Sequence, residues 1–467
     1  MDMSFKYIDL FAGIGGFHAA LSSLGGECVY VSEIDKAAAK IYQKNWQMKV
    51  DGDITLVAND DGVKIPQHDV LVGGFPCQPF SKSGHQRGME EARGTLFWNI
   101  AKIIEKRRPA LVVLENVRNI AGPRHIHEWE VIISTLRQLG YQVSSKPLIV
   151  SPHKIHPNYG GRPQVRERVL IAATRIPKGG KPNSLVEPPN LEHLYEGWDP
   201  LRWNLQTDLP LEQKLSSEFL KESMLSETEL EWLEAWNEFV ILMKKEMQGR
   251  NLPGFPIWVD AWVESKSLKI PRGTPDWKRD FLIKNSNFYS EHKKTLDAWL
   301  KRWNGLKDFP PSRRKFEWQA QDAKDLYSTV MHFRPSGIRA KKPTYLPALV
   351  AITQTSILGN LRRRIVPIEA QRLQGFPDWF SFEGQSTAAT FKQLGNAVNV
   401  AVVYHVMKAL VERDEDLLKS YPELVNTILQ APQTPDVVLM KLPQEVRENL
   451  NRRKRVRQLS LPVLLDD

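Results

Sequence analysis

The stretch DLFAGIGGFHAAL, residues 9–21, predicts the architecture of the first part of the chain. An apolar run, KYIDLF (6–11), reads as a strand that enters a Gly-rich turn, and an amphipathic helix over 17–25 follows until a Gly-Gly pair stops it. Such a turn lets the backbone approach a ligand closely, and the helix amides point at the ligand's polar end. The dinucleotide fingerprint needs a glycine three residues after Gly15, but His18 stands there. A pyrophosphate is therefore not the expected ligand.

Two acidic residues follow this turn at positions suited to a nucleoside. Glu33 ends the next apolar strand about 20 residues on, where a carboxylate can accept both ribose hydroxyls. Asp53, in GDI (52–54), can accept an amino group such as that of adenine. The alternative is a purely structural turn in which both acids cap helices.

The segment up to residue 176 alternates strands with helices. Its short runs rich in Val and Leu, bounded by turn residues, are typical of strands buried on both faces of a parallel sheet. This alternation predicts an α/β fold of the doubly wound, Rossmann-like kind. The expected strands are 28–33, 68–74, 110–117 and 168–175, and the expected helices are 35–46, capped by Asp35, 96–108 and 128–140.

Composition excludes several classes of protein. The 467 residues are 42% hydrophobic and 25% charged, which is ordinary for a globular chain of two or three domains. Two cysteines, Cys28 and Cys77, are too few for a disulfide framework or a Cys-based zinc site. No apolar run reaches the roughly 18 residues of a membrane span, and no secretory signal is visible. We expect a soluble protein of a reducing compartment, with no membrane partner.

The middle of the chain differs from its ends. A Pro/Gly-rich linker covers 176–190, and 190–330 holds ten of the 14 tryptophans beside long charged helical stretches. We expect a separate, mostly helical domain with these tryptophans in its core rather than in a base-stacking platform. Residues 181–243 carry 4 Lys or Arg against 13 Asp or Glu, whereas 244–315 carry 17 against 8. With a net charge of +10, this polarity indicates a polyanionic partner, usually nucleic acid.

The segment GGFPCQPFS, residues 73–81, predicts a nucleophile. Cys77 lies between two prolines just after a buried strand, at the edge of an α/β sheet where ligands bind. A structural cysteine would usually lie inside an apolar strand, as we expect of Cys28. The stretch 81–93 contains two glycines and reads as a closing loop. The alternative for Cys77 is a Pro-flanked structural turn.

Three further residues are candidates for the same site because they occur together with Cys77. Glu115, in ENV (115–117), ends the next apolar strand and should project beside Cys77, where a carboxyl suggests acid work. Arg166 and Arg168, in QVRERV (164–169), are two residues apart and hence expected on one side of a strand. Two guanidiniums there could hold a phosphate, or fix a carboxylate and a bound base. Singly, each residue also fits a helix cap or surface charge.

With DLFAGIGG, GGFPCQPFS, ENV and QVRERV in this order, the chain resembles the DNA (cytosine-5) methyltransferases of prokaryotic restriction–modification systems. The stretches RRRIVPIEAQRLQGFPDWF (362–380) and FKQLGNAVNVAVV (391–403) resemble the family's last two blocks. The resemblance covers about 1–176 and 330–410, and it implies an S-adenosylmethionine-dependent methyltransferase domain with a second, mostly helical target-recognition domain. The implied division is 1–176 for catalysis and cofactor binding, 177–345 for target recognition, 346–415 for a return to the catalytic domain and 416–467 for a peripheral extension.

The resemblance also implies roles for single residues. Cys77 would be the nucleophile, Glu115 the acid at the cytosine ring, and Arg166 and Arg168 the ring-side partners. Two departures, Ala397 for a common Ser and Ile368 for a common Arg, leave the reaction centre untouched. The residues expected to hold S-adenosylmethionine are Phe11, Gly13, Gly15, Gly16, Glu33, Ile34, Asp53, Ile54, Pro76, Leu96 and Asn396.

The implied reaction moves a methyl group to C5 of a cytosine flipped out of a specific duplex sequence, through a covalent Cys77–C6 adduct. It leaves S-adenosylhomocysteine and needs no metal. Its setting would be a prokaryotic cytoplasm, where a monomer protects host DNA against a separate cognate restriction endonuclease. The residues expected to contact DNA are Ser81, Ser83, Gln86, Arg87, Arg339 and Lys341, with further basic candidates in Arg334, Lys342 and Arg362–Arg364.

Other functions remain open at this point. The tRNA-methylating branch of the family is similar in its catalytic blocks but carries a Cys-Phe-Thr motif, and this chain has no third cysteine. A silent DNA-binding regulator on the same scaffold would predict loss of Cys77 or Glu115, and both are present. A small-molecule methyltransferase would not need the polarised middle region. The recognised DNA sequence cannot be read from the chain.

Overall fold

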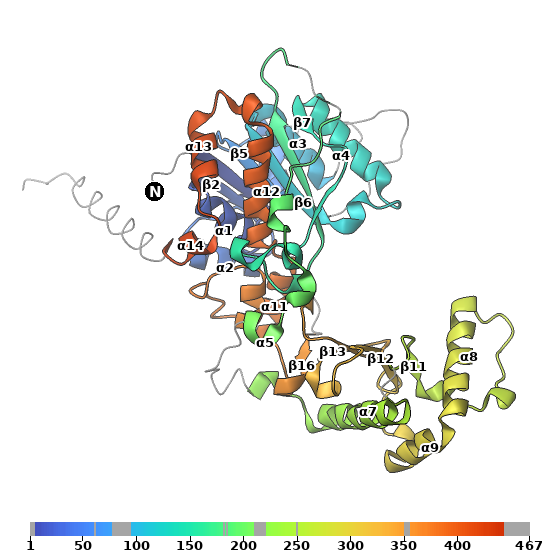
Figure 1. Ribbon diagram of the computed structural model, residues 1–467. Coiled ribbons are helices and arrows are strands. Elements are labelled where there is room, and N and C mark those ends of the chain that lie inside the picture. Colours follow the sequence, from blue (N-terminus) through green and yellow to red (C-terminus); the bar gives the residue numbers. More distant parts are fainter. Residues whose placement is uncertain are drawn as a thin grey trace, which may run out of the picture. The chain divides into compact units, whose positions relative to one another are not determined.

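The structure, a computed structural model, describes residues 5–59, 62–76, 95–180, 183, 185–209, 221–248, 251–349 and 355–442. The chain divides into two units: one joins Met1–Pro200 with Gln371–Asp467, and the other is Leu201–Ala370. The first unit is therefore built from both ends of the chain, and the second is one continuous insertion (Figure 1).

A seven-stranded sheet organises the first unit, in the order β2-β1-β5-β6-β10-β7, with β8 also pairing with β10. The first four strands of this order run parallel to one another, whereas β10 runs antiparallel to its neighbours. The predicted alternation of strands and helices is confirmed. The strands are β1 (Phe5–Leu10), β2 (Gly26–Ser32), β5 (Val70–Gly74), β6 (Leu111–Val117), β7 (Tyr141–Val143), β8 (Leu148–Val150) and β10 (Arg168–Arg175).

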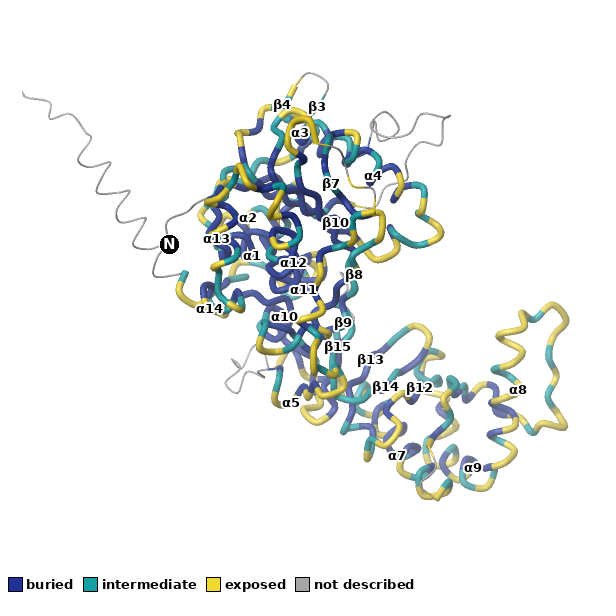
Figure 2. Tube along the Cα trace, turned by 45° about the horizontal axis from the view of Figure 1, so that its top comes forward, coloured by how far each residue is buried: buried dark blue, intermediate teal, exposed yellow. Residues whose placement is uncertain are grey.

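Helices cover both faces of this sheet, and alternate strand residues pack against opposite layers. In β5, Val70 and Val72 join a core with α1, α12 and α13, whereas Leu71 joins a second core with α3 and α4. Buried residues follow these layers in Figure 2. The helices are α1 (Gly16–Ser23), α2 (Lys36–Trp46), α3 (Leu96–Arg107), α4 (Ile126–Gln138), α11 (Thr387–Asn396), α12 (Val400–Arg413), α13 (Pro422–Gln430) and α14 (Asp436–Leu439).

Short elements complete the first unit. A two-stranded hairpin pairs β3 (Ala58–Asn59) with β4 (Gly62–Val63), and β9 (Gln164–Val165) precedes β10. The Asp35 side chain caps α2 by accepting from the amides of Ala37 and Ala38, as expected. By length and composition, one helical stretch of the described residues, Thr387–Arg413, could cross a membrane, but 89% of its apolar window is buried inside the protein.

The second unit combines helices with a six-stranded sheet in the order β11-β12-β14-β13-β16-β17. Helices form most of its regular structure, as expected, but the sequence pattern did not predict the sheet. The strands are β11 (Ile257–Trp258), β12 (Lys315–Gln319), β13 (Val330–Arg334), β14 (Gly337–Lys341), β16 (Ile357–Leu358) and β17 (Arg363–Arg364), with β15 (Leu346–Pro347) outside this sheet. The helices are α5 (Leu205–Asp208), α7 (Glu227–Glu246), α8 (Asp276–Glu291) and α9 (Lys293–Arg302), and α10 (Pro367–Leu373) crosses the unit boundary.

Tryptophans form much of the core of the second unit, as predicted. Trp236 and Trp299 are fully buried, and their ring centroids lie 5.4 Å apart. Trp236 also stacks on Phe316 of β12 at 4.8 Å, so α7 and the sheet share one core. Both of these indoles keep a polar partner: Trp236 donates to the carbonyl of Arg313, and Trp299 to that of Ala235.

Candidate active site

A cavity of about 480 Å³ opens in the first unit where β1, β2, β5 and β6 end. In an open α/β sheet, the carboxyl edge of the parallel strands is where ligands bind. Phe11, Glu33 and Phe75 directly follow β1, β2 and β5, and Val117 is the last residue of β6; all four line the cavity. The cavity therefore lies at the edge of the sheet where the sequence predicted a ligand site.

The Gly-rich turn after β1 forms one wall of the cavity. Gly13 has a φ of +55°, and a Cβ added there would meet no atom within 4 Å, so the backbone faces open space. Its amide donates to Glu33 Oε2 at 2.7 Å. Gly16 begins α1, and a Cβ there would lie 2.7 Å from the carbonyl oxygen of Val398. The turn thus exposes backbone to a ligand and packs against the C-terminal segment.

Gly15 does not line the cavity, although the family resemblance implied a cofactor contact for it. It adopts the left-handed conformation, with a φ of +92°, and a Cβ there would lie 2.2 Å from Trp46 Nε1. That indole nitrogen donates to the carbonyl of Ile14 at 3.0 Å. The requirement for glycine at this position comes from Trp46 packing on the turn.

The two predicted nucleoside acids lie in this cavity, and backbone groups orient both. Glu33 accepts from the amides of Gly13 and Asp35, each at 2.7 Å, so each carboxylate oxygen has a fixed donor. Asp53 Oδ1 accepts from Thr55 N at 2.9 Å and from Thr55 Oγ1 at 2.8 Å. Ile34, between them in the lining, is 70% exposed, so an apolar surface is available to a planar ring.

Glu115 brings a buried carboxyl into the same cavity. It lies in β6 opposite Gly74 of β5, and a Cβ on Gly74 would lie 3.4 Å from Glu115 Oε2. Arg168 Nε lies 2.9 Å from Glu115 Oε1. Burial raises the pKa of Glu115 above its ordinary value, and the charges of Arg166 and Arg168 oppose that shift. The net direction favours a carboxyl that holds its proton more readily than a solvated glutamate.

Arg166 ties the C-terminal segment to the cavity. It is 2% exposed, and its guanidinium donates to the carbonyls of Gly395 at 2.9 Å and Ala397 at 2.7 Å. It lies between β9 and β10 rather than within one strand, so the expected strand over 164–169 is interrupted there. Even so, Arg166 and Arg168 both line the cavity.

Most of the expected site residues that the structure describes meet in this one cavity. The lining includes Phe11, Gly13, Gly16, Glu33, Ile34, Asp53, Ile54, Pro76, Leu96, Glu115, Arg166, Arg168 and Asn396. Cys77 lies outside the described residues, as do Ser81, Ser83, Gln86 and Arg87. Pro76, which precedes Cys77 in the sequence, is the last described residue before that gap.

Some polar residues at this edge were not singled out from the sequence. Asn116 is buried, and its amide donates to the carbonyl of Phe75 at 2.9 Å, which joins the end of β6 to the turn after β5. Lys392 and Gln393 line the cavity beside Asn396. All three residues lie in the motifs ENV and FKQLGNAVNVAVV, but a motif alone does not predict which of its side chains turn inward.

The expected DNA-contacting residues that are described lie in the second unit. Arg339 and Lys341 project from β14, and Arg339 pairs with Glu317. Among the other basic candidates, Arg363 is 4% exposed and pairs with the fully buried Glu369, with Arg363 Nη2 and Glu369 Oε1 2.7 Å apart. Arg363 therefore stabilises the fold and is not available to DNA, contrary to expectation.

A family model described as C-5 cytosine-specific DNA methylase matches residues 5–412. The chain belongs to this family. It is therefore a DNA (cytosine-5) methyltransferase, and the family uses S-adenosylmethionine as its methyl donor. This DNA methylase is 45% identical to the Type II methyltransferase M.AluI of Cellulosimicrobium cellulans, over 91% of this chain and 96% of that protein.

A second relative of this DNA methylase is the Type II methyltransferase M.HhaI of Haemophilus parahaemolyticus, 30% identical over 86% of this chain and 92% of that protein. Among solved structures, the S. pombe Dnmt2 methyltransferase aligns with 87% of this chain and 98% of its own, at 16% identity and a TM-score of 0.43. That structural likeness is too low to add to the family assignment.

The donor set of the cavity suits the family's methyl donor. Glu33 offers oriented carboxylate oxygens to a ribose, Ile34 an exposed apolar surface to a base, and Gly13 open space beside its backbone. The cavity volume falls within the range of small-molecule sites. Among the residues that the structure describes, no group of three or more His, Cys, Asp or Glu side chains could hold a metal ion.

Proposed function

We propose that this DNA methylase transfers a methyl group to C5 of a cytosine flipped out of a specific duplex sequence, through a transient bond between Cys77 Sγ and cytosine C6. The observation that carries the proposal is the convergence of Glu33, Asp53, Glu115 and Arg168 on one cavity at the edge of the sheet that leads to Cys77. S-adenosylmethionine bound there supplies an electrophilic sulfonium methyl group.

The cofactor lies against one group of the residues that line the cavity. Glu33 accepts hydrogen bonds from the ribose hydroxyls, since its orientation is already fixed by two backbone amides. Asp53 accepts from the adenine amino group, with Ile34 and Ile54 against the ring. The remaining contacts fall to Phe11, Gly13, Gly16, Pro76, Leu96 and Asn396.

The chemical role of Cys77 follows from the electronic structure of cytosine, whose C5 is a poor nucleophile. The Cys77 thiolate adds to C6, so an S–C6 bond forms and the electron pair of the C5–C6 double bond becomes available at C5. C5 then bonds the methyl carbon as the sulfonium S–CH₃ bond breaks, which leaves S-adenosylhomocysteine. Loss of the C5 proton to a base and cleavage of the S–C6 bond release 5-methylcytosine and restore Cys77.

Glu115 controls the proton at cytosine N3. Because burial favours its protonated form, the Glu115 carboxyl donates a hydrogen bond to N3 and stabilises the charge that develops when the thiolate adds. Arg168, 2.9 Å from Glu115 Oε1, orients that carboxyl. Arg166 holds the segment of Gly395 and Ala397 against the cavity, and so positions the wall that carries Asn396.

The substrate must leave the double helix, because none of these groups can reach C5 or C6 in a stacked base. Flipping costs a few kcal/mol, which contacts to the opened duplex offset. The DNA contacts fall to Ser81, Ser83, Gln86 and Arg87 near the nucleophile and to Arg339 and Lys341 in the second unit. The setting is a restriction–modification system in a prokaryotic cytoplasm, in which a monomer marks host DNA against a separate endonuclease.

A transfer assay tests this proposal. The protein is incubated with labelled S-adenosylmethionine and either duplex DNA or tRNA, the label in each nucleic acid is counted, and the methylated cytosines of the DNA are located by bisulfite sequencing. We expect label in DNA, at cytosines of one short sequence. The variant Cys77→Ser should transfer at a rate lower by 1000-fold or more. Label in tRNA alone would refute the substrate, and unimpaired transfer by Cys77→Ser would refute the covalent mechanism.

A further inference from the structure

Polar side chains occupy one face of the central strands in the second unit. The register pairs Glu317 of β12 and His332 of β13 with Arg339 of β14, so these three side chains share a face. The opposite face carries Phe316, Trp318, Met331, Phe333, Ile338 and Ala340, all buried in the tryptophan-rich core. The backbone under the polar face is therefore held in place, because the opposite face of the same strands is packed in the core.

A single carboxylate fixes two side chains on this face. Glu317 Oε2 accepts from Arg339 Nε at 2.7 Å, and Glu317 Oε1 accepts from the amide of Gln319. The Arg339 and Glu317 side chains are 23% and 19% exposed, so water screens this pair less than a surface ion pair. The bond to Nε holds the plane of the guanidinium and leaves the edge with both Nη groups unconstrained by Glu317.

The charge of the face suits a polyanion. Strands β12, β13 and β14 bring Lys315, Arg334, Arg339 and Lys341 to it against the one carboxylate of Glu317. His332 remains neutral, because burial and then the neighbouring cations lower its pKa to about 3, and its Nε2 lies 2.7 Å from Ser356 Oγ. An excess of positive charge attracts the phosphate backbone, whereas oriented Arg and Gln side chains are the groups that read base edges.

We propose that Arg339 reads a guanine of the recognised duplex sequence through O6 and N7 in the major groove, and that Glu317 is its positioning residue. This inference rests on the proposed function. A planar guanidinium matches two acceptors on one guanine edge, and no other base presents that pair in the major groove. Fixing the guanidinium beforehand lowers the ordering cost on binding. Gln319, held by the same carboxylate, places an amide beside it.

A cycle between protein and DNA variants tests the assignment. Bisulfite sequencing with the wild-type protein first identifies the recognised sequence. Each guanine of that sequence is then replaced in turn by 7-deazaguanine, which lacks N7, and methyl transfer is measured as kcat/KM. At one guanine we expect the replacement to slow the wild type by 10-fold or more and to slow Arg339→Ala by less than 3-fold, because the contact is already lost.

Glu317→Gln keeps the shape of the positioning residue but removes its charge. We expect it to lose part of the discrimination at that same guanine, to about 3-fold, while binding to non-specific duplex changes by less than 2-fold. The matched control is Arg302→Ala, which breaks another Arg–Glu pair of this unit, that of Arg302 with Glu238, at 2.5 Å. Arg302→Ala should keep the full wild-type sensitivity to 7-deazaguanine.

The outcomes separate this inference from the proposed function. A wild type that labels no duplex DNA refutes the proposed function. If the wild type methylates DNA but Arg339→Ala and Arg339→Lys are as sensitive as the wild type to 7-deazaguanine at every position, the guanine contact alone is refuted. Since Arg339→Lys keeps the charge and removes the fork, a loss of discrimination in both variants supports bidentate reading over loss of folding.

Discussion

Glu115 combines burial with two neighbouring cations, and burial prevails, so its pKa lies above the ordinary value. If the protonated form acts at the cytosine ring, kcat must fall as pH rises through that pKa. We expect Glu115→Gln to lower kcat by about 10²- to 10⁴-fold and to lack this alkaline limb. Rates over a pH series measure both effects, with calorimetry confirming unchanged S-adenosylmethionine affinity. A variant with more than a tenth of wild-type kcat would contradict the role.

Asp9, the first residue of the motif DLFAGIGG, shows that a motif residue can affect stability instead. It is fully buried, and burial and the charge of Glu33 raise its pKa, partly opposed by the amide of His18. Between the unfolded pKa of about 4 and the folded value, the native state binds one more proton, so unfolding free energy falls by about 1.4 kcal/mol per pH unit. Urea denaturation at a series of pH values above the unfolded pKa should show this loss for the wild type relative to Asp9→Asn.

The exposed Asp280, paired with Lys284 at 2.6 Å, provides the control for Asp9. Asp280→Asn should follow the wild-type pH dependence, because a solvated pair contributes little. Parallel pH profiles for Asp9→Asn and the wild type would show that Asp9 is ionised in the folded protein.

At the scale of elements, the sequence predicted what local pattern determines. The runs rich in Val and Leu became β5 and β6, and the cap at Asp35 began α2 as expected. The six-stranded sheet was not predicted, because its strands are two to five residues long and pair with strands far away in the sequence, as Ile257 does with Phe316. The position of Arg166 between two strands was not predicted for the same reason. Its hydrogen-bond partners, the carbonyls of Gly395 and Ala397, lie far away in the sequence.

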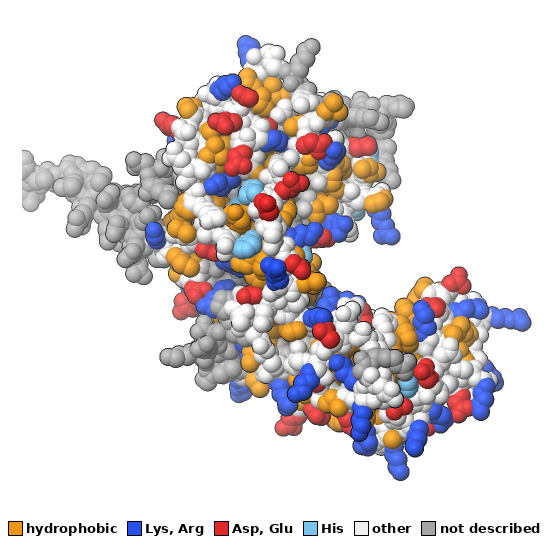
Figure 3. Space-filling view, viewed as in Figure 1, with side chains coloured by type: hydrophobic (Ala, Val, Ile, Leu, Met, Phe, Trp, Pro, Cys, Tyr) orange, Lys and Arg blue, Asp and Glu red, His pale blue; other side chains and the backbone are white. Residues whose placement is uncertain are grey.

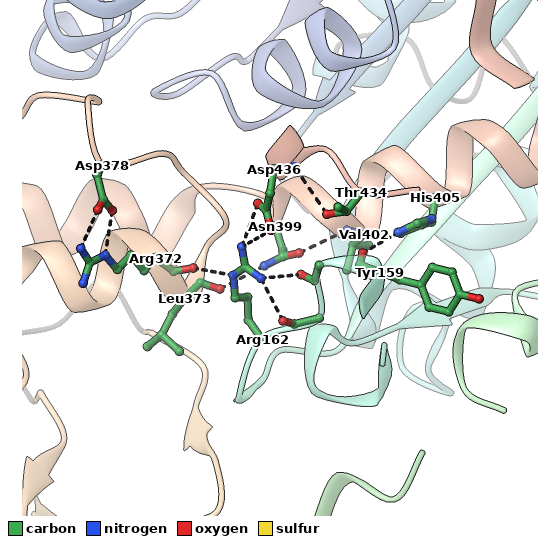
Figure 4. A network of polar contacts seen from close by, with 12 residues as sticks. Tyr159, Arg162, Arg372, Leu373, Asp378, Asn399, Val402, His405, Thr434 and Asp436 are labelled. Carbon is green, nitrogen blue, oxygen red and sulfur yellow. Dashed lines mark hydrogen bonds and ion pairs between the residues drawn. The ribbon is translucent and has the colours of Figure 1, made fainter. Parts of the chain in front are cut away.

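Arg162 links α14 to the rest of the first unit, beside the bond from Trp379 Nε1 to the carbonyl of Leu439 at 2.8 Å. Arg162 donates to the carbonyls of Gly160, Gly161 and Arg372 and to both oxygens of Asp436, at 2.7 and 2.8 Å (Figure 4). We expect Asp436→Asn to speed amide exchange over 435–440 by about 10-fold or more, since it removes a charge-assisted pair. Hydrogen exchange read by mass spectrometry measures this.

The same view contains the control for that substitution. Arg372 pairs with Asp378 at 2.6 Å, but the Asp378 side chain is 63% exposed (Figure 4). Asp378→Asn should leave exchange over 435–440 within about 2-fold of the wild type. Equal effects of the two substitutions would mean that Arg162 does not anchor α14.

At the scale of the whole molecule, charge should govern how the protein meets DNA. The chain carries a net charge of +10, and Lys and Arg side chains are spread over the visible surface of the second unit (Figure 3). Each neutralised phosphate steepens the salt dependence, so affinity for non-specific duplex should fall at least about 10-fold between 50 and 200 mM salt. Fluorescence anisotropy measures this fall, and affinity independent of salt would contradict it.

The position of Val398, Ala397 and Asn396 against a turn near residue 13 has a consequence for biosynthesis. A nascent chain emerging from the ribosome carries the β1 turn early, but it lacks the facing wall until Val398 has been added. Translation products truncated before Asn396 therefore cannot complete the lining of this cavity. In a cell that begins to express this protein, methyl transfer would therefore start only after translation has passed Val398.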